Sequence, residues 1–435
     1  MEEKGSYASL LLDVRLKRSP LPLPEKRLST ELVYGVLRHR GRIDWFLEKV
    51  SHRPLEAMGV GLRNLLRLGI YQLCFLEKIP AYAAVNEAVT LAARFGGESA
   101  ASFTNAVLRE ICRQRDAISY PDPRADPVGF IAAFHSHPRW LVERWVHRFG
   151  QEEATALAAA NNQEAPVVVR ANPLKCKAHE LQKVLQAQVE SLEESPLVPE
   201  TFCLRGASSI WELDAFHQGW FAVMDEAAVL VVHLLDPQPG ELILDACAGA
   251  GGKAALAAML TQDRANILAL DVNERALARL RENCLRLGVQ GVKALFLDAR
   301  QAGKRLSEKV NRILVDAPCT GLGTLRRHPE IKWRLEPNSL KRLPELQLEL
   351  LEGVLPCLRL GGVLVYSTCS TEPEENEEVI ARLLQNHPEL ELEDPTPYLP
   401  LAREGLVRGG EFLQTYPQRQ GIDGFFAARL RIRDR

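Results

Sequence analysis

The sequence predicts an α/β fold in its C-terminal half, a Rossmann-like sheet preceded by an all-helical domain and a small α+β module. Three observations support this. Apolar residues recur at helical spacing up to about residue 145, short apolar runs accompany one helical pattern in residues 146–225, and strands alternate with helices from residue 226. Alternation of this kind is typical of a parallel sheet covered on both faces. We therefore expect three domains, residues 1–145, 146–225 and 226–435.

The composition is that of an ordinary folded protein. With 46% hydrophobic and 25% charged residues, the disordered and fibrous classes are excluded. Nine cysteines without a Cys-x-x-Cys pair argue against a zinc site or a disulfide scaffold, and they favour a reducing cytoplasm. There is no signal-peptide pattern and no apolar run of membrane-spanning length. We expect a cytoplasmic protein that binds no metal and no membrane, and a monomer because nothing indicates an assembly.

The N-terminal domain is predicted to be helical and to bind RNA. Its expected helices are Glu31–Val50, Leu62–Leu76, Val85–Phe95 and Phe103–Cys112. Residues 1–150 contain 22 Lys and Arg against 16 Asp and Glu, an excess compatible with nucleic acid, although a solvated helical surface gives the same count. Proline-containing stretches at residues 120–123 and 135–138 predict a linker. In the following module, Pro166–Arg170 predicts a strand and Ala178–Gln188 a helix.

Five apolar runs predict the strands of the C-terminal sheet: Leu242–Asp245, Ile267–Asp271, Val292–Leu297, Ile313–Asp316 and Val363–Ser367. The expected helices are Lys253–Leu260, Glu274–Leu287, Leu340–Leu358 and Glu374–Gln385. Phe412–Tyr416 and Phe425–Leu430 predict a closing hairpin. Ligands of open α/β sheets bind at the carboxyl ends of the strands. The loops that follow these strands are therefore the predicted site.

The first of these loops, Asp245–Lys253, is rich in glycine and can be interpreted in three ways. A phosphate-binding P-loop is excluded, because Cys247 stands where its first glycine belongs and Ala254 replaces the Ser or Thr that binds magnesium. The motif does satisfy the dinucleotide-binding pattern, with Asp271 ending the next strand. It suits S-adenosylmethionine equally, since that cofactor also requires close backbone approach and a carboxylate for its ribose. This motif alone leaves a dehydrogenase and a methyltransferase open.

The downstream residues favour the methyltransferase. Asp298 ends the third strand, where it can reach the adenine of a compact nucleoside cofactor. Asp316, Cys319 and Cys369 lie just beyond two further strands, in loops rather than in apolar helical patterns. Carbon 5 of cytosine is a poor nucleophile, and a thiolate that adds to carbon 6 activates it. An acid such as Asp316 assists at the ring nitrogen, and a base must then remove the carbon 5 proton.

Five motifs resemble those of the RNA cytosine-5 methyltransferase family: Asp245–Lys253, Asp316–Gly321, Arg326–Trp333, Tyr366–Ser370 and Asp423–Phe426. The resemblance is greatest to the bacterial members that act on 16S (small-subunit) rRNA. The N-terminal domain is similar to the RNA-binding fold of transcription antitermination factors, for example at Tyr71–Leu73 and Asn105–Arg109. The resemblance therefore spans nearly the whole chain.

The resemblance implies a role for each thiol. In the family, the cysteine of the Thr-Cys motif is the nucleophile, here Cys369, and the cysteine of the Pro-Cys motif, here Cys319, assists product release. Residue chemistry alone leaves these roles open, because DNA cytosine enzymes use a Pro-Cys thiol as nucleophile. By the same resemblance S-adenosylmethionine is the cofactor. Its expected contacts are Cys247, Ala248, Gly249, Ala250, Gly251, Gly252, Lys253, Asp271, Asp298 and Asp316.

Two further expectations concern the cofactor loop and the RNA. The family usually has proline where this chain has Ala250, and the more flexible backbone is expected to weaken cofactor binding by about 1 kcal/mol at most. Basic and aromatic side chains after the Pro-Cys loop are expected to hold the RNA backbone and stack a base; these are Arg326, Arg327, Lys332 and Trp333. The alternative is a charged surface loop. The target cytosine should be flipped out or lie in a loop.

We conclude from the sequence that the protein is an S-adenosylmethionine-dependent rRNA cytosine-5 methyltransferase whose partner is small-subunit rRNA. Two alternatives remain. One is a nicotinamide-dependent dehydrogenase, which would show no dependence on cysteine. The other is a non-catalytic ribosome-assembly factor that keeps the fold but has lost turnover through Ala250, and such a protein need not bind S-adenosylmethionine.

Overall fold

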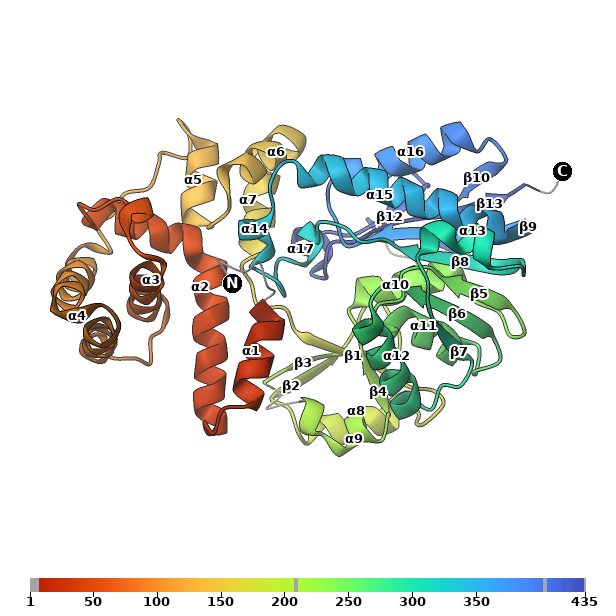
Figure 1. The fold of residues 1–435 in the computed structure, drawn as a ribbon, viewed down its shortest axis with the longest axis horizontal. Helices are drawn as coiled ribbons and strands as arrows, with labels where there is room; N and C mark the ends of the chain where they lie inside the picture. The colour runs from red at the N-terminus through yellow and green to blue at the C-terminus, as the bar shows by residue number, and fades with distance from the viewer. Residues whose placement is uncertain (1–7, 207–209, 402–404, 434–435) are drawn as a thin grey trace. The chain divides into compact units, whose positions relative to one another are not determined.

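The computed structural model describes residues 8–206, 210–401 and 405–433. The chain forms two compact units, which Figure 1 shows as ribbons. The first unit comprises residues 1–163 and 325–335, and the second comprises residues 164–324 and 336–435. The predicted boundary near residue 145 thus falls inside the first unit, and the small α+β module shares the second unit with the large sheet. The division into three domains stays a prediction.

The first unit is helical, as predicted. Its α-helices are α1 (Ala8–Lys17), α2 (Leu23–Val50), α3 (Val60–Phe75), α4 (Ala81–Gln114), α5 (Pro127–Phe134), α6 (Arg139–Phe149), α7 (Gln151–Ala160) and α14 (Ile331–Arg334). Fully buried Ile43, Leu66, Ile70 and Leu108 lie at the centre of the α2–α4 core. The expected break between two helices takes the form of a kink within α4, where Gly97 has a φ of 76°.

The linker predicted around residues 120–138 is wrong in part, because α5 forms within it. Asp126 caps this helix by accepting a hydrogen bond from the N–H of Gly129 at 2.8 Å. Pro127 follows at the first helical position, where its missing N–H costs nothing. The pair Asp126-Pro127 therefore starts a helix, although the prolines of this stretch predicted only a linker.

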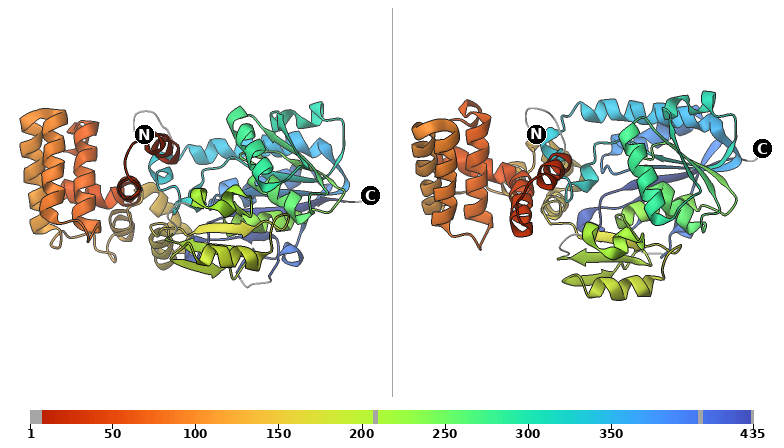
Figure 2. Two further views of the ribbon diagram at one scale, coloured as in Figure 1. Left: turned by 90° about the horizontal axis from the view of Figure 1, so that it is seen from below. Right: turned by 60° about the horizontal axis from the view of Figure 1, so that its bottom comes forward.

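The second unit begins with a small antiparallel sheet. Its strands are β1 (Val167–Ala171), β2 (Ser191–Glu194), β3 (Thr201–Arg205) and β4 (Phe221–Val223), in the order β2-β3-β1-β4. Helices α8 (Ala178–Gln186) and α9 (Asp214–His217) lie over it, as the right-hand view of Figure 2 shows. Phe202 and Phe221 form its core together with Leu181 and Leu185 of α8. The α+β character of this module confirms the prediction.

The large sheet combines parallel and antiparallel strands. Its strands are β5 (Leu242–Asp245), β6 (Asn266–Asp271), β7 (Val292–Phe296), β8 (Val310–Asp316), β9 (Leu358–Thr368), β10 (Leu390–Glu393), β11 (Val407–Arg408), β12 (Phe412–Gln414) and β13 (Phe426–Ile432). The order is β11-β12-β13-β9-β8-β5-β6-β7, with β10 paired to β13. Strands β5 to β9 pair in parallel, and the predicted C-terminal hairpin, β12 and β13, adds antiparallel strands beside β9.

Helices cover both faces of this sheet, as Figure 1 shows. One face carries α10 (Glu226–Leu235), α11 (Gly252–Leu260) and α12 (Glu274–Leu287), and the other carries α13 (Ala302–Arg305), α15 (Ser339–Val354) and α16 (Glu377–Asn386). From β5 the chain adds β6 and β7 on one side of the sheet, and then β8 and β9 on the other, so the strand order reverses at β5. Ligands of such sheets bind at this switch point, beyond the carboxyl ends of the strands. Within the described ranges, none of the helices has the length and apolar character needed to cross a membrane.

Candidate active site

The glycine-rich loop after β5 turns sharply and leads directly into α11. Gly249 and Gly251 have φ angles of 55° and 82°, in the left-handed region that glycine adopts most easily. A Cβ at Gly251 would lie 2.4 Å from Cγ of Leu280, so the loop packs closely on α12. A Cβ at Gly249 would meet nothing within 4 Å. The backbone N–H groups of this loop are therefore accessible at the N-terminus of α11. A nucleoside cofactor binds in such an environment.

Two carboxylates follow the neighbouring strands β6 and β7. Asp271 accepts hydrogen bonds from the N–H of Gly249 at 2.9 Å and from the N–H of Asn273 at 2.8 Å, which fixes the glycine loop above β6. Asp298 accepts from the guanidinium of Arg300 at 2.7 Å, and these hydrogen bonds lower the pKa of Asp298 although burial opposes them. The contacts of both carboxylates with ribose and adenine stay predictions.

Lys253 and Asp316 form an ion pair at the centre of the site. The Lys253 Nζ lies 2.6 Å from Asp316 Oδ2, and the hydroxyl of Ser367 donates to Asp316 Oδ1 at 2.8 Å. Burial disfavours the charged form of Lys253, but the neighbouring Asp316 outweighs it, so the pKa of Lys253 is raised. The sequence analysis had assigned Lys253 to the cofactor and had missed Ser367. The pair holds one carboxylate and one ammonium group in fixed orientation at the end of β8.

Asp245, at the end of β5, is a buried acid with only 2% of its surface exposed. Neither carboxylate oxygen has a hydrogen-bond partner of good geometry among the described residues, although the backbone N–H of Cys247 lies near enough to favour the charged form slightly. Burial, with a smaller contribution from the negative charge of Asp316, raises the pKa of Asp245 to about 7, although Lys253 opposes the shift. Between about pH 4 and pH 7, therefore, Asp245 is protonated in the folded protein but ionised in the unfolded chain.

This raised pKa predicts a pH-dependent stability. Because the folded state binds the proton more tightly, the free energy of unfolding falls as pH rises from about 4 to about 7. We expect Asp245→Asn in the cofactor-free protein to raise the free energy of unfolding by roughly 4 kcal/mol at pH 8, and to change it little near pH 4. Urea unfolding at both pH values measures the difference, and a difference independent of pH would contradict the assignment. Asp298→Asn is the control. Because the pKa of Asp298 is lowered, its contribution to stability is lost only below about pH 4, and the effect of this variant should be nearly the same at both pH values.

The two predicted thiols lie together. The Sγ atoms of Cys319 and Cys369 are 3.1 Å apart, in the loops that follow the neighbouring parallel strands β8 and β9. The N–H of Gly323 donates to the carbonyl of Cys369 at 2.9 Å, which joins the loops through the backbone. The hydrogen bond with Cys369, followed by burial, raises the pKa of Cys319 well above its ordinary value. The raised pKa favours the protonated form of Cys319, and either sulfur can donate the hydrogen bond between the two thiols.

A buried carboxylate that the sequence analysis missed lies behind the thiols. Glu375 is 0% exposed and accepts hydrogen bonds from Thr320, Ser370 and Gln347. Thr320 directly follows Cys319, and Ser370 directly follows Cys369. The sequence shows Glu375 only as an acid shortly after the Thr-Cys-Ser motif. It does not show the hydrogen-bond partners of Glu375, which come from segments far apart in the chain.

The four residues predicted to bind RNA belong to the helical unit. Lys332 is fully buried, and its ammonium group donates at 2.9 Å to the Arg38 carbonyl and at 2.9 Å to Asn162 Oδ1. Burial lowers the pKa of Lys332 well below its ordinary value, and the charge of Arg38 adds to this. Trp333 donates from its indole N–H to the Leu37 carbonyl at 2.6 Å.

Arg326 is also buried, with 5% of its surface exposed, and its carbonyl accepts a hydrogen bond from Arg38 at 3.1 Å. Arg327 is half-buried. The segment thus packs into the helical unit, which neither the RNA-binding prediction nor its alternative, a charged surface loop, had anticipated. RNA contact by Arg326, Arg327, Lys332 and Trp333 stays a prediction.

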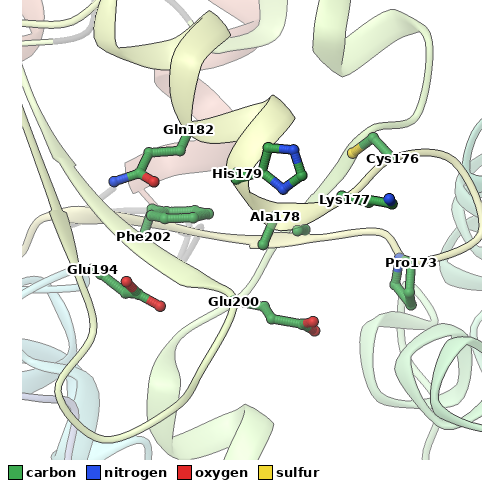
Figure 3. A pocket seen from close by; sticks show the side chains of 10 residues that line it. Pro173, Cys176, Lys177, Ala178, His179, Gln182, Glu194, Glu200 and Phe202 are labelled. Atoms are coloured by element: carbon green, nitrogen blue, oxygen red, sulfur yellow. The ribbon is translucent and has the colours of Figure 1, made fainter.

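A pocket of about 430 Å³ lies on the small sheet of the second unit, and none of the predicted site residues lines it. Figure 3 shows His179, Lys177 and Cys176 on one side, with Glu194 and Glu200 below. Opposite charges therefore share this pocket. The predicted site, in contrast, is built at the carboxyl ends of the strands of the large sheet.

A doubly covered sheet with a glycine loop at its switch point, and with paired thiols beside an acid, defines an α/β group-transfer enzyme. Comparison with known families agrees. Residues 232–431 match the family described as "16S rRNA methyltransferase RsmB/F", residues 137–211 match its ferredoxin-like domain, and residues 1–113 match the NusB family.

Two named proteins are similar to this chain over nearly its whole length. A Bacillus subtilis protein named "Probable ribosomal RNA small subunit methyltransferase B" is 37% identical, covering 99% of this chain and 96% of its own. A Synechocystis protein of the same name is 36% identical, with the same coverage. The solved structure of a "Methyltransferase Homolog Protein" from Pyrococcus horikoshii is 33% identical with a TM-score of 0.59, covering 69% of this chain and 97% of that one.

The chain therefore belongs to the RsmB/F family of 16S rRNA methyltransferases. This membership confirms the predicted resemblance, including the antitermination-factor-like N-terminal domain. It also confirms the predicted class, an rRNA methyltransferase that depends on S-adenosylmethionine.

Proposed function

We propose that this protein methylates carbon 5 of a cytosine in 16S rRNA, through a covalent bond between Cys369 and carbon 6 of the base. The observation that carries the proposal is the thiol pair, with Cys319 and Cys369 Sγ atoms 3.1 Å apart at the ends of adjacent strands. Membership of the family indicates methyl transfer to rRNA. The two thiols are our reason for proposing carbon 5 of cytosine as the methylated atom. The same proposal places the protein in the cytoplasm, acting as a monomer on small-subunit rRNA.

The residues at the switch point fit the cofactor. S-adenosylmethionine, when bound, supplies a methyl group on a positively charged sulfur. The loop from Cys247 to Lys253 would hold it with backbone N–H groups, because Gly249 leaves open space on that side. Asp271 and Asp298, at the ends of the next two strands of the sheet, would accept hydrogen bonds from its ribose and adenine.

Two side chains would activate the target base. The Cys369 thiolate adds to carbon 6, which makes carbon 5 electron-rich enough to take a methyl group. Asp316, a carboxylate in its pair with Lys253, would pass the proton released by Cys369 to the ring nitrogen as the negative charge of the adduct develops. Lys253 keeps Asp316 oriented, and the charge of this lysine also interacts with Cys369.

Cys319 is suited to the second half of the reaction. Its raised pKa, caused first by the hydrogen bond with Cys369 and then by burial, means that its thiolate is a strong base. When Cys369 bonds to carbon 6, the hydrogen bond and the negative charge that raise the pKa of Cys319 would be lost, so Cys319 could release its proton to solvent. Once carbon 5 is methylated, the Cys319 thiolate would take the carbon 5 proton. The electron pair of that bond would form the double bond between carbons 5 and 6, and Cys369 would leave carbon 6 as a thiolate. We thus assign the nucleophile to Cys369 and product release to Cys319.

The experiment supplies the purified protein with methyl-labelled S-adenosylmethionine and either 16S rRNA or isolated small subunits. We expect label in the RNA, recovered after digestion as 5-methylcytidine by nucleoside mass spectrometry. Label in another nucleoside would contradict the proposed target atom. Failure to label either RNA, without cofactor binding by calorimetry, would favour the non-catalytic assembly factor.

A further inference from the structure

We propose that Glu375 is a positioning residue, which holds the Cys319 and Cys369 loops at the separation that a two-thiol reaction requires. This inference rests on the proposed function, because it gives the buried carboxylate its purpose there. Glu375 itself need not touch substrate or cofactor.

The Glu375 carboxylate contacts the residue after each thiol. Its Oε1 accepts from the N–H of Thr320 at 2.8 Å, and its Oε2 accepts from the Thr320 hydroxyl at 2.5 Å. Oε2 also accepts from the hydroxyl of Ser370, and the two hydroxyl oxygens lie 3.2 Å apart. One carboxylate therefore joins two loops whose cysteines are 50 residues apart in the chain.

A third segment completes this network. The side-chain amide of Gln347, on α15, donates to Glu375 Oε1 at 3.1 Å and to the carbonyl of Pro318 at 3.0 Å. Pro318 directly precedes Cys319, so the loop is held on both sides of its thiol. The hydroxyl of Tyr366 donates to the Glu375 carbonyl at 2.6 Å, which ties the backbone of the carboxylate to β9.

The network requires an ionised carboxylate rather than any buried polar group. Four donors converge on Glu375, and a carboxylate has about four acceptor sites and no hydrogen of its own. Burial raises the pKa of Glu375, and the hydrogen bonds from Ser370, Thr320 and Gln347 reduce this rise by favouring the charged form, without reversing it. A glutamine of equal size would present an NH₂ group to donors and would leave buried donors unpaired.

The charge of Glu375 also reaches the thiols. The hydrogen bond with Cys369 and burial are the main causes that raise the pKa of Cys319, and the negative charge of Glu375 adds to them. Loss of this charge should let Cys319 form its thiolate at lower pH. A purely structural carboxylate elsewhere in the unit would have no such effect.

The test compares Glu375→Gln with Glu226→Gln. Glu226 is a matched control, since it is 4% exposed and accepts from the Ser195 hydroxyl at 2.6 Å, outside the site. We expect Glu375→Gln to lower kcat roughly 100-fold, as small displacements of reacting groups do. The KM for S-adenosylmethionine should change little, and alkylation of Cys319 by iodoacetamide should shift to lower pH. Thr320→Val, which removes one of the hydrogen bonds, should lower kcat about 10-fold and serves if Glu375→Gln does not fold.

A second readout needs no activity. Diamide oxidises two adjacent thiols to a disulfide and takes up their two hydrogens, and peptide mass spectrometry measures how fast Cys319 and Cys369 are joined. We expect the joining to be at least 10-fold slower in Glu375→Gln than in the wild type and in Glu226→Gln, because the sulfurs are no longer held together. Unchanged joining and unchanged kcat would overturn the inference. If the wild type methylates nothing while joining is slowed, the positioning role stands and the proposed function fails.

Discussion

Cys369→Ala is expected to abolish both methyl transfer and the covalent protein–RNA adduct. Without the Cys369 sulfur to add to carbon 6, carbon 5 of cytosine remains a poor nucleophile. Cys319 loses its hydrogen bond with Cys369 in this variant, but burial and the negative charge of Glu375 still raise its pKa and disfavour its thiolate. We expect a loss of roughly 10⁴-fold or more in kcat, the scale on which nucleophile deletions act. Labelled methyl incorporation and a denaturing gel for the adduct measure the two signals.

Cys319→Ala is expected to behave differently. Addition and methylation still occur, but the base that releases the product is missing, so the adduct should accumulate while turnover stops. Cys284→Ala is a suitable control, because Cys284 is a buried cysteine of α12 outside the site. Methylation by Cys369→Ala would show that the nucleophile is assigned wrongly, and accumulation of adduct in that variant would reverse the roles of the two thiols.

Asp316→Asn is expected to lower kcat by about 10²- to 10⁴-fold, the contribution of a well-placed acid or base. The amide can neither hold the proton at the ring nitrogen nor neutralise Lys253, whose ammonium lies 2.6 Å from the carboxylate. Single-turnover kinetics with saturating RNA, together with cofactor affinity by calorimetry, separates the two roles predicted for Asp316. A large loss of S-adenosylmethionine affinity with normal single-turnover rate would make Asp316 a cofactor ligand only.

The control for this variant is another ion pair of the same unit. Glu241 pairs with Arg312, and their side chains are 15% and 10% exposed, similar to the 13% of Lys253 and 29% of Asp316. Glu241→Gln breaks this pair at the start of β5, away from the carboxyl ends of the strands. Equal loss of kcat in both variants would show that the effect of Asp316→Asn is general destabilisation.

The sheet and the meeting of the thiols could be predicted because both depend on local patterns. Apolar runs specified the parallel strands, and parallel strands bring their carboxyl ends to one edge. Glu375 could not be found in this way. Its role depends on contacts with Thr320 and Gln347, which lie 55 and 28 residues away and approach it only once the sheet has formed.

The burial of Lys332 was missed for a related reason. A lysine among arginines in a loop resembles a solvated or RNA-binding surface, since lysine is rarely buried without partners. Here the partners are the carbonyl of Arg38 and the side chain of Asn162, which are distant in sequence. Helix α5 was not predicted because the prolines near it indicate a linker. Asp126 nevertheless caps this helix.

The inclusion of residues 325–335 in the helical unit has a consequence for biosynthesis. The unit begins at the N-terminus, yet Leu325 is fully buried, and so is Lys332, whose partners are Arg38 and Asn162. Domains usually fold in order as the ribosome releases them. This unit cannot complete its packing until residue 335 has been synthesised, after the glycine loop and the first thiol. We expect residues 1–163 expressed alone to lack the packing that Leu325 and Lys332 supply, and so to be less stable than the same helices in the full chain.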